Sequence, residues 1–190
     1  MRAFIAIELS PPIREKLAEL QALLKKSGAD VKWVKPDNIH LTLKFLGEID
    51  EEKRGKIEEI IENTARASKQ FPISLSSLGA FPKIEFPRVI WVAIDQGDKE
   101  VKILAKDLEE RIEKLGIPKE ERPFSSHITI GRVRSPLNKD KLTQVLKESE
   151  NYFSNKIIEF NAGKITLFKS ALGPSGPAYE ALKEVNMIIA

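Results

Sequence analysis

Cysteine is absent from the 190 residues of this chain. Disulfide bonds, thiol nucleophiles and thiolate metal ligands are therefore excluded. Histidine is almost as rare, because only His40 and His127 occur. Two histidines fall short of the three protein ligands that a catalytic zinc ion usually has. No His-Glu-x-x-His motif or carboxylate cluster accompanies them. The sequence therefore argues against a metal hydrolase, and we expect neither a metal site nor a cofactor.

Long apolar runs, phosphate-binding loops and a strong net charge are also missing. No apolar run approaches the length of a membrane-spanning helix, and the first apolar stretch is too short for a signal peptide. We therefore expect a cytoplasmic protein with no membrane partner. Neither a Gly-x-x-x-x-Gly-Lys-Ser/Thr loop nor the Lys-x-Asp-Gly context of nucleotidyl-lysine ligases occurs. The net charge of +3 permits a phosphate-rich partner without requiring one.

Hydrophobic periodicity predicts an α+β protein. Apolar residues at helical spacing, with capping and breaking residues at the ends, predict helices over 10–28, 51–68, 99–115 and 139–148. Strands are predicted over 2–8, 31–34, 40–47, 73–78, 89–94, 127–133, 157–168 and 179–189, with turns at 35–38 and 172–177. Each half of the chain opens with a strand and a helix before it reaches a strand that contains a histidine. We therefore expect two similar lobes of about 95 residues each, with antiparallel sheets that face one another.

The two histidines stand in the same four-residue pattern, His40-Leu41-Thr42-Leu43 and His127-Ile128-Thr129-Ile130. Successive side chains of a strand point to opposite faces. Each segment therefore places its histidine and threonine on one face and two aliphatic residues on the other. The aliphatic face can enter a core while the polar face lines a cleft. The paired pattern predicts an active site with two imidazoles and two hydroxyls.

This set of side chains suits phosphodiester chemistry. The unperturbed pKa of histidine, about 6.5, lets one imidazole donate a proton to a leaving oxygen while the other takes one from the nucleophile. Threonine hydroxyls can donate hydrogen bonds to the phosphate oxygens. A single His-x-Thr strand is usually a structural accident at a strand edge. Two copies that use every histidine of the chain favour the functional interpretation.

The motif regions, His40 to Glu48 and Ser126 to Arg132, closely resemble the His-x-Thr-x motifs of the two-histidine phosphoesterase superfamily. The match is to its LigT-like group, the RNA 2',3'-cyclic phosphodiesterases that are also called 2'-5' RNA ligases. The likeness covers nearly the whole chain, 1–190, as one two-lobed domain. It implies two pseudo-symmetric lobes with antiparallel sheets around a central groove and helices on the outer faces. It also implies hydrolysis of a 2',3'-cyclic phosphate to a 2'-phosphate end, with 2'-5' ligation as the reverse chemistry.

The resemblance also implies a role for each motif residue. His40 would protonate the leaving 3' oxygen, His127 would activate water, and Thr42 and Thr129 would hold the phosphate. The partners it implies are RNA ends that carry a 2',3'-cyclic phosphate, tRNA fragments among them, bound by a monomer. Nothing in the sequence itself orders the two histidines as acid and base.

Three further residues have weaker support. Arg132 matches an arginine that follows the second motif in relatives and could contact the phosphate or base, but strict alternation places it on the face opposite His127. That role therefore requires a β-bulge or a strand end. Lys44 shares the parity of His40 and could add charge to the groove, although a solvated lysine is the more common case. Phe124 could stack on a base, although core packing is the more frequent fate of phenylalanine.

A second functional class stays open from sequence: a relative that grips nucleotides without turnover. The presence of all four polar motif residues argues against such a binding module. Turnover that is lost on substitution of either histidine, while nucleotide binding persists, distinguishes the enzyme from the binder.

Overall fold

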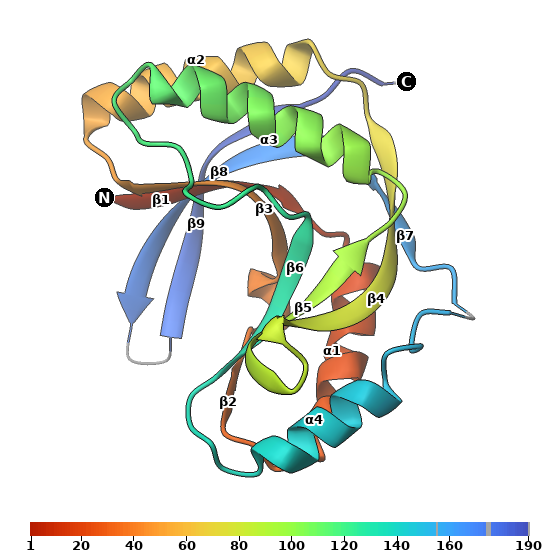
Figure 1. Ribbon diagram of the computed structural model, residues 1–190. Coiled ribbons are helices and arrows are strands. Elements are labelled where there is room, and N and C mark those ends of the chain that lie inside the picture. Colours follow the sequence, from red (N-terminus) through yellow and green to blue (C-terminus); the bar gives the residue numbers. More distant parts are fainter. Residues whose placement is uncertain (155, 174–175, 190) are drawn as a thin grey trace.

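The computed structural model describes residues 1–154, 156–173 and 176–189, so positions 174 and 175 of the predicted turn at 172–177 lie outside the described residues. Within the described part, helices and strands alternate along much of the chain (Figure 1). The helices are α1 (Pro11–Lys25), α2 (Glu51–Arg66), α3 (Asp98–Glu113) and α4 (Lys139–Glu148), with a short 3₁₀ turn, η1, at Pro36–Asn38. The strands are β1 (Arg2–Glu8), β2 (Val31–Trp33), β3 (His40–Glu48), β4 (Phe71–Lys83), β5 (Phe86–Ile94), β6 (His127–Val133), β7 (Glu159–Ala162), β8 (Lys164–Gly173) and β9 (Gly176–Asn186).

The strands form two sheets in which all neighbours are antiparallel. The order is β3-β1-β8-β9 in the first sheet and β2-β6-β5-β4-β7 in the second. The expected α+β class with two antiparallel sheets is confirmed. The two lobes are not contiguous halves of about 95 residues, however. The first sheet takes β1 and β3 from the start of the chain and β8 and β9 from its end, whereas the second sheet takes β2, which lies between β1 and β3 in sequence, together with β4 to β7.

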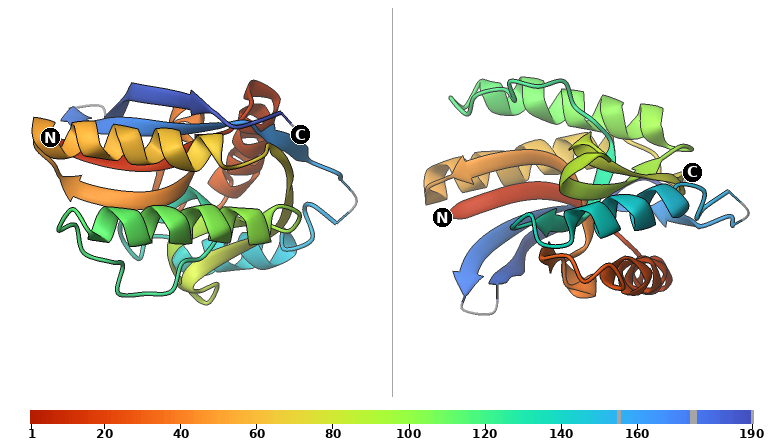
Figure 2. Two further views of the ribbon diagram at one scale, coloured as in Figure 1. Left: turned by 90° about the horizontal axis from the view of Figure 1, so that it is seen from above. Right: turned by 60° about the horizontal axis from the view of Figure 1, so that its bottom comes forward.

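The helices cover the sheets in pairs. Helices α2 and α3 lie side by side on the first sheet, where they pack against β3, β8 and β9 (Figure 2). Helices α1 and α4 lie on the second sheet. Each helix buries one apolar face, as the spacing of Leu17, Leu20 and Leu24 in α1 shows. None of the helices in the described ranges combines the length and the apolar character that crossing a membrane requires.

Two element predictions differ from the structure. The strand predicted over 157–168 is divided at Gly163 into β7 and β8, which belong to different sheets. An apolar run carries no mark of such a crossing, because both pieces bury apolar residues, Phe160 and Ala162 in β7 and Ile165 and Leu167 in β8. The strand predicted over 73–78 is also too short, since β4 continues to Lys83. Pro82 lies opposite Pro87 beside the turn of the β4–β5 hairpin. Prolines at this end of the hairpin remove few of the hydrogen bonds that join the two strands.

Candidate active site

The two His/Thr strands, β3 and β6, have the alternation that the sequence predicts. Leu41 and Leu43 are buried in the core on one side of β3, and Ile128 and Ile130 are buried on one side of β6. The histidines and threonines between them are only partly buried. β3 and β6 also approach each other across the two sheets. The polar faces of both strands therefore look into the space between the lobes.

Both strands carry a β-bulge at the same position of the motif. In β3, Thr42 pairs with Ala6 and Lys44 pairs with Ile5, which leaves Leu43 without a partner. In β6, Thr129 pairs with Trp91 and Gly131 with Ile90, so Ile130 is left out in the same way. An extra residue reverses the alternation that follows it.

The bulges decide where the next two residues of each strand lie. Past the bulge, Arg132 returns to the face of His127, so the structural condition for its predicted role is met. Phe45 occupies the matching position in β3 and is 56% exposed. Lys44 is turned to the opposite face. It is 3% exposed, and its Nζ lies 3.2 Å from Glu109 Oε1 and donates to the carbonyl of Pro118 at 2.9 Å.

Both sequence interpretations of Lys44 are therefore wrong: it is neither in the groove nor solvated. Its ion pair with Glu109 and its bond to Pro118 join β3 to α3 and to the loop that follows α3. That loop carries Arg122 and Phe124 toward the site. Lys44 thus supports one wall of the cleft from behind.

The two imidazoles are oriented by the same local hydrogen bond. His40 Nδ1 lies 2.7 Å from the carbonyl oxygen of Asn38, and His127 Nδ1 lies 2.7 Å from that of Ser125. Each carbonyl belongs to the residue two positions before the histidine. Because a carbonyl oxygen only accepts, Nδ1 carries the proton in both rings. Nε2 is therefore the reactive nitrogen, as a base in the neutral ring and as an acid in the cationic one.

Burial lowers the pKa of both histidines. For His40, loss of solvent dominates and the nearby Arg14 adds to it, while the bond to Asn38 partly opposes the shift, so the pKa falls to about 4. The pKa of His127 is also lowered, chiefly by burial and further by Arg132. Both imidazoles are consequently neutral at pH 7 in the free protein. An anionic phosphate at Nε2 would raise the pKa again and supply the cationic form.

The aromatic surroundings of the two histidines differ. The ring of His40 stacks on Phe4, with centroids 4.7 Å apart and planes inclined by 27°, and Tyr179 meets it edge-on at 5.4 Å. His127 has only edge contacts, the nearer one to Phe81 at 5.1 Å. The ring face of Phe4 favours an imidazolium, so it opposes part of the effect of burial on His40.

Two cavities contain the motif residues. The main cavity, of about 350 Å³, is lined by Thr42, His127, Thr129 and Arg132. A small cavity of about 110 Å³ is lined by His40 together with Arg14, Asn38 and Tyr179. The structure therefore brings four of the five predicted site residues into one cavity. It places His40 in the small cavity, two residues from Thr42 on the same strand face.

Sequence reasoning missed several side chains of these cavities. Phe45 and Phe81 line the main cavity beside Phe124, and Tyr179 lines the small one. The bulge that exposes Phe45 has no signal in a single sequence. Tyr179 comes from the far end of the chain, and only the pairing of β9 with β8 brings it to His40. Among the described residues, no three histidine, aspartate or glutamate side chains are grouped as metal ligands.

Comparisons with known proteins agree with this geometry. The family model for LigT-like phosphoesterases matches the chain twice, at residues 7–91 and 92–179, and each match contains one His/Thr strand. A Methanocaldococcus jannaschii protein named RNA 2',3'-cyclic phosphodiesterase is 40% identical over 184 residues, covering 97% of this chain and 99% of its own. A protein of the same name from Methanothermobacter thermautotrophicus is 34% identical over 179 residues, covering 94% of this chain and 95% of its own.

Solved structures give the same result. A Thermus thermophilus protein, TT0787, superposes with a TM-score of 0.81 at 28% identity and covers 98% of both chains. Escherichia coli LigT in complex with 3'-AMP superposes with a TM-score of 0.75 at 25% identity, covering 98% of this chain and 97% of its own. The matches span both His/Thr strands and nearly the full length of the protein. On this basis, the chain belongs to the LigT-like phosphoesterase family.

Proposed function

We propose that this protein hydrolyses the 2',3'-cyclic phosphate ends of RNA to 2'-phosphate ends by acid–base catalysis with two histidines. The observation that carries the proposal is the repeated device in β3 and β6. Each strand presents an imidazole whose Nδ1 is held by a carbonyl, followed by a threonine on the same face. Relatives, one of them 40% identical, bear the name RNA 2',3'-cyclic phosphodiesterase, which supports the substrate.

In the proposed reaction, water enters on the side of His127. Nε2 of His127 takes a proton from the water as its oxygen attacks phosphorus. The bond between phosphorus and the 3' oxygen breaks, and Nε2–H of His40 gives its proton to that oxygen. The products are a 2'-phosphate and a 3'-hydroxyl, with His127 protonated and His40 neutral. Proton exchange with solvent restores both rings. The order of the two histidines rests on the family resemblance.

The other motif residues would bind the phosphate. Thr42 and Thr129 donate hydroxyl hydrogen bonds to non-bridging oxygens, and Arg132 adds a cationic donor that cannot be neutralised. Charge on these oxygens increases in the transition state, so donors that are already in place stabilise it. All three line the main cavity with His127.

The phenylalanines of the main cavity would hold the terminal base. Phe45, Phe81 and Phe124 come from β3, β4 and the loop before β6. Aromatic rings stack on unpaired bases with little sequence preference. We propose that the partners are RNA ends, tRNA fragments among them, and that the protein acts as a cytoplasmic monomer without a cofactor. The same reaction with a 5'-hydroxyl in place of water would form a 2'-5' linkage.

The test is incubation of an oligoribonucleotide that ends in a 2',3'-cyclic phosphate, in the presence of EDTA, with the product end identified by phosphorus NMR. The wild type is expected to give a 2'-phosphate. His40→Ala and His127→Ala should each lower the rate by about 10² to 10⁴-fold. The double variant should lose little more, because the two groups act in one step.

Binding separates this proposal from a nucleotide-binding module. Calorimetry with 3'-AMP should show that both histidine variants retain most of their affinity. A 3'-phosphate product would overturn the proposed bond cleavage at the 3' oxygen, and no turnover by the wild type would overturn the hydrolase. Nucleotide binding by a wild type that does not turn over would establish the binding module instead.

A further inference from the structure

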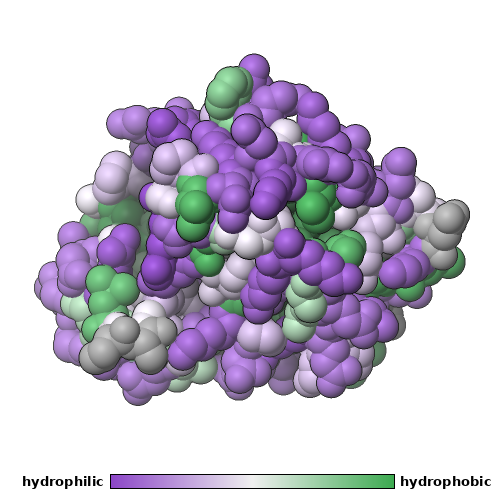
Figure 3. Space-filling model, turned by 90° about the horizontal axis from the view of Figure 1, so that it is seen from below, coloured by the Kyte–Doolittle hydropathy of each residue, from purple (hydrophilic) through white to green (hydrophobic). Residues whose placement is uncertain are grey.

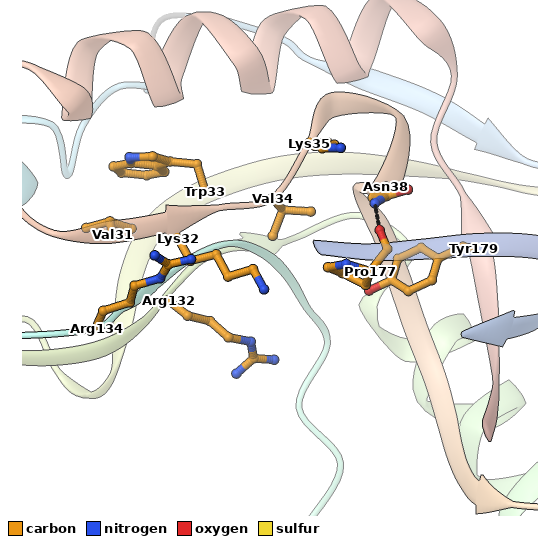
Figure 4. A pocket seen from close by; sticks show the side chains of 10 residues that line it. All are labelled: Val31, Lys32, Trp33, Val34, Lys35, Asn38, Arg132, Arg134, Pro177 and Tyr179. Atoms are coloured by element: carbon orange, nitrogen blue, oxygen red, sulfur yellow. Dashed lines mark hydrogen bonds between the residues drawn. The ribbon is translucent and has the colours of Figure 1, made fainter. Parts of the chain in front are cut away.

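A third cavity, of about 380 Å³, adjoins both cavities of the active site (Figure 4). It lies between the β2–β6 edge of the second sheet and the start of β9 in the first sheet. It shares Arg132 with the main cavity, and it shares Asn38 and Tyr179 with the small cavity. We call it the basic groove, after Lys32, Arg132 and Arg134 in its lining. Any molecule in it would lie next to the two cavities that contain His40 and His127.

These three cations of the basic groove lie on one face of the two strands. Lys32 is directly opposite Arg132 in the β2–β6 register. Arg134 follows Arg132 by two residues, and its amide donates to the carbonyl of Asp30, so the ladder continues to that point. Two like charges that face each other across an antiparallel pair are destabilising. The edge of the sheet therefore carries a repulsion that an anion would relieve.

No carboxylate of the protein relieves it in the described ranges. None of the residues that line the basic groove is acidic, and neither its three strand cations nor Lys35, which lines it just before η1, has an ion-pair partner there. The helices show the opposite pattern, in which lysines and arginines pair with glutamates one turn away, as Lys56 does with Glu52. A net charge of +3 for the whole chain thus conceals a local excess of positive charge.

The opposite wall of the basic groove is fixed by polar contacts. Asn38 donates its side-chain amide to the carbonyl of Pro177 at 2.8 Å, which ties η1 to the start of β9 (Figure 4). Lys32 extends across the groove, and its Nζ lies 3.9 Å from the position that a Cβ on Gly176 would take. The surrounding surface, on the side of α4 and β2, is mostly hydrophilic (Figure 3). This character suits a solvated phosphate chain and not an apolar partner.

We propose that the basic groove binds the RNA phosphates immediately upstream of the terminal nucleotide. The inference rests on the proposed function, because the cyclic phosphate must lie between the histidines. In the proposed reaction His40 protonates the 3' oxygen and so faces the ribose, and the basic groove shares Asn38 and Tyr179 with the cavity of His40. The main cavity, with its phenylalanines, takes the terminal base, and the cation-lined groove takes the backbone. The enzyme therefore recognises an RNA strand and not only its last nucleotide.

The test compares kcat/KM for cytidine 2',3'-cyclic phosphate with values for oligoribonucleotides of two, three and six residues that end in the same group. For the wild type we expect kcat/KM to rise by about tenfold or more from the mononucleotide to the trinucleotide, and the gain to shrink at high salt. The double variant Lys32→Gln/Arg134→Gln should lose most of that gain through KM and keep the mononucleotide rate. Lys32→Arg should retain the gain.

The matched control is Lys99→Gln/Lys114→Gln, which removes the same charge at the ends of α3, on the other side of the molecule (Figure 1). It should leave the length dependence intact. A wild type indifferent to length, or a groove variant that slows mononucleotide and oligonucleotide equally, would overturn the proposal. Failure of the proposed function looks different, because the wild type would then turn over neither substrate.

Discussion

Strands β3 and β6 carry the same arrangement of motif side chains up to their bulges and different side chains beyond them. Up to that point each presents a histidine held by a carbonyl, a threonine and two buried aliphatic residues. Beyond the bulge, β3 continues with Lys44 and Phe45, and β6 with Gly131 and Arg132. The shared part supplies a pair of proton carriers. The unshared part adds an aromatic side chain to the cleft from β3 and a cationic one from β6.

The difference has structural causes behind the strands as well. Lys44 reaches back to Glu109 and Pro118, so β3 supports the loop that carries Phe124. Gly131 faces Trp33 of β2, whose ring lies where a Cβ would be, so β6 can accept another strand beside it. That additional strand brings Lys32 to the basic groove. The residue after the bulge thus supports a loop in β3, where it is Lys44, and leaves room for a neighbouring strand in β6, where it is Gly131.

The largest expected difference between the two histidines is in the pH dependence of stability. The pKa of His40 is about 4 in the folded protein and about 6.5 in the unfolded chain. The unfolded chain therefore binds a proton that the folded protein excludes, and stability falls as the pH decreases from 6.5 to 4. The loss amounts to at most about 3 kcal/mol. Urea unfolding of the wild type and His40→Gln at pH 7.5, 6, 5 and 4 measures it.

His40→Gln should flatten this part of the curve more than His127→Gln does. Protonation of carboxylates such as Glu8, whose pKa is lowered, also reduces the stability of all three proteins at the lowest pH values. Because this contribution is shared, the comparison isolates the histidines. Equal curves for the wild type and His40→Gln would show that His40 is not protected from protonation.

Gly131→Ala tests the contrast between β3 and β6, because it should remove the space that β2 occupies beside β6. An added Cβ would lie 2.9 Å from Val31 Cγ1 and 3.0 Å from Trp33 Cε3, so β2 must move. We expect a loss of about 1–3 kcal/mol, as in other overpacked sites. The matched control is Gly55→Ala in α2, where nothing lies within 4 Å and alanine should add about 0.5–1 kcal/mol. Thermal unfolding measures the stability of both variants. Equal changes in stability would contradict the close packing of β2 against Gly131.

The smallest expected effects come from the two residues that the bulges turn into the cleft. Arg132→Gln removes a charged hydrogen-bond donor and should lower kcat/KM for a cyclic mononucleotide about tenfold. Phe45→Leu keeps an apolar contact and should cost about threefold, chiefly in KM. Steady-state kinetics with one cyclic mononucleotide compares them directly. A larger loss for Phe45→Leu would reverse the assignment of phosphate to Arg132 and base to Phe45.

Much of the site could be predicted from local pattern, because alternation within four residues needs no tertiary information. His40, Thr42, His127 and Thr129 are such cases. Lys44 and Arg132 lie just beyond the four-residue motifs, and their faces depend on a bulge that the neighbouring strand determines. Parity counting therefore gave the wrong face for Lys44. The condition stated for Arg132, that a bulge must intervene, is the one the structure meets.

The helices were predicted closely for the same reason: each contains its own periodicity and ends. Sheet membership was not predictable, since pairing partners lie far apart in sequence. The stretch from Ile157 to Phe168 shows the limit. Apolar residues recur on both sides of Gly163, yet this residue separates β7 in one sheet from β8 in the other.

The placement of β1 between β3 and β8 has a consequence for the order in which the protein is made. Residues 3 to 7 are buried, yet β8 begins only at Lys164. During synthesis β1 can pair with β3 early, but its other edge stays open until β8 has been made. The first sheet is therefore completed only after β2 to β7 have been made, and the cleft that both sheets form cannot act on RNA before then.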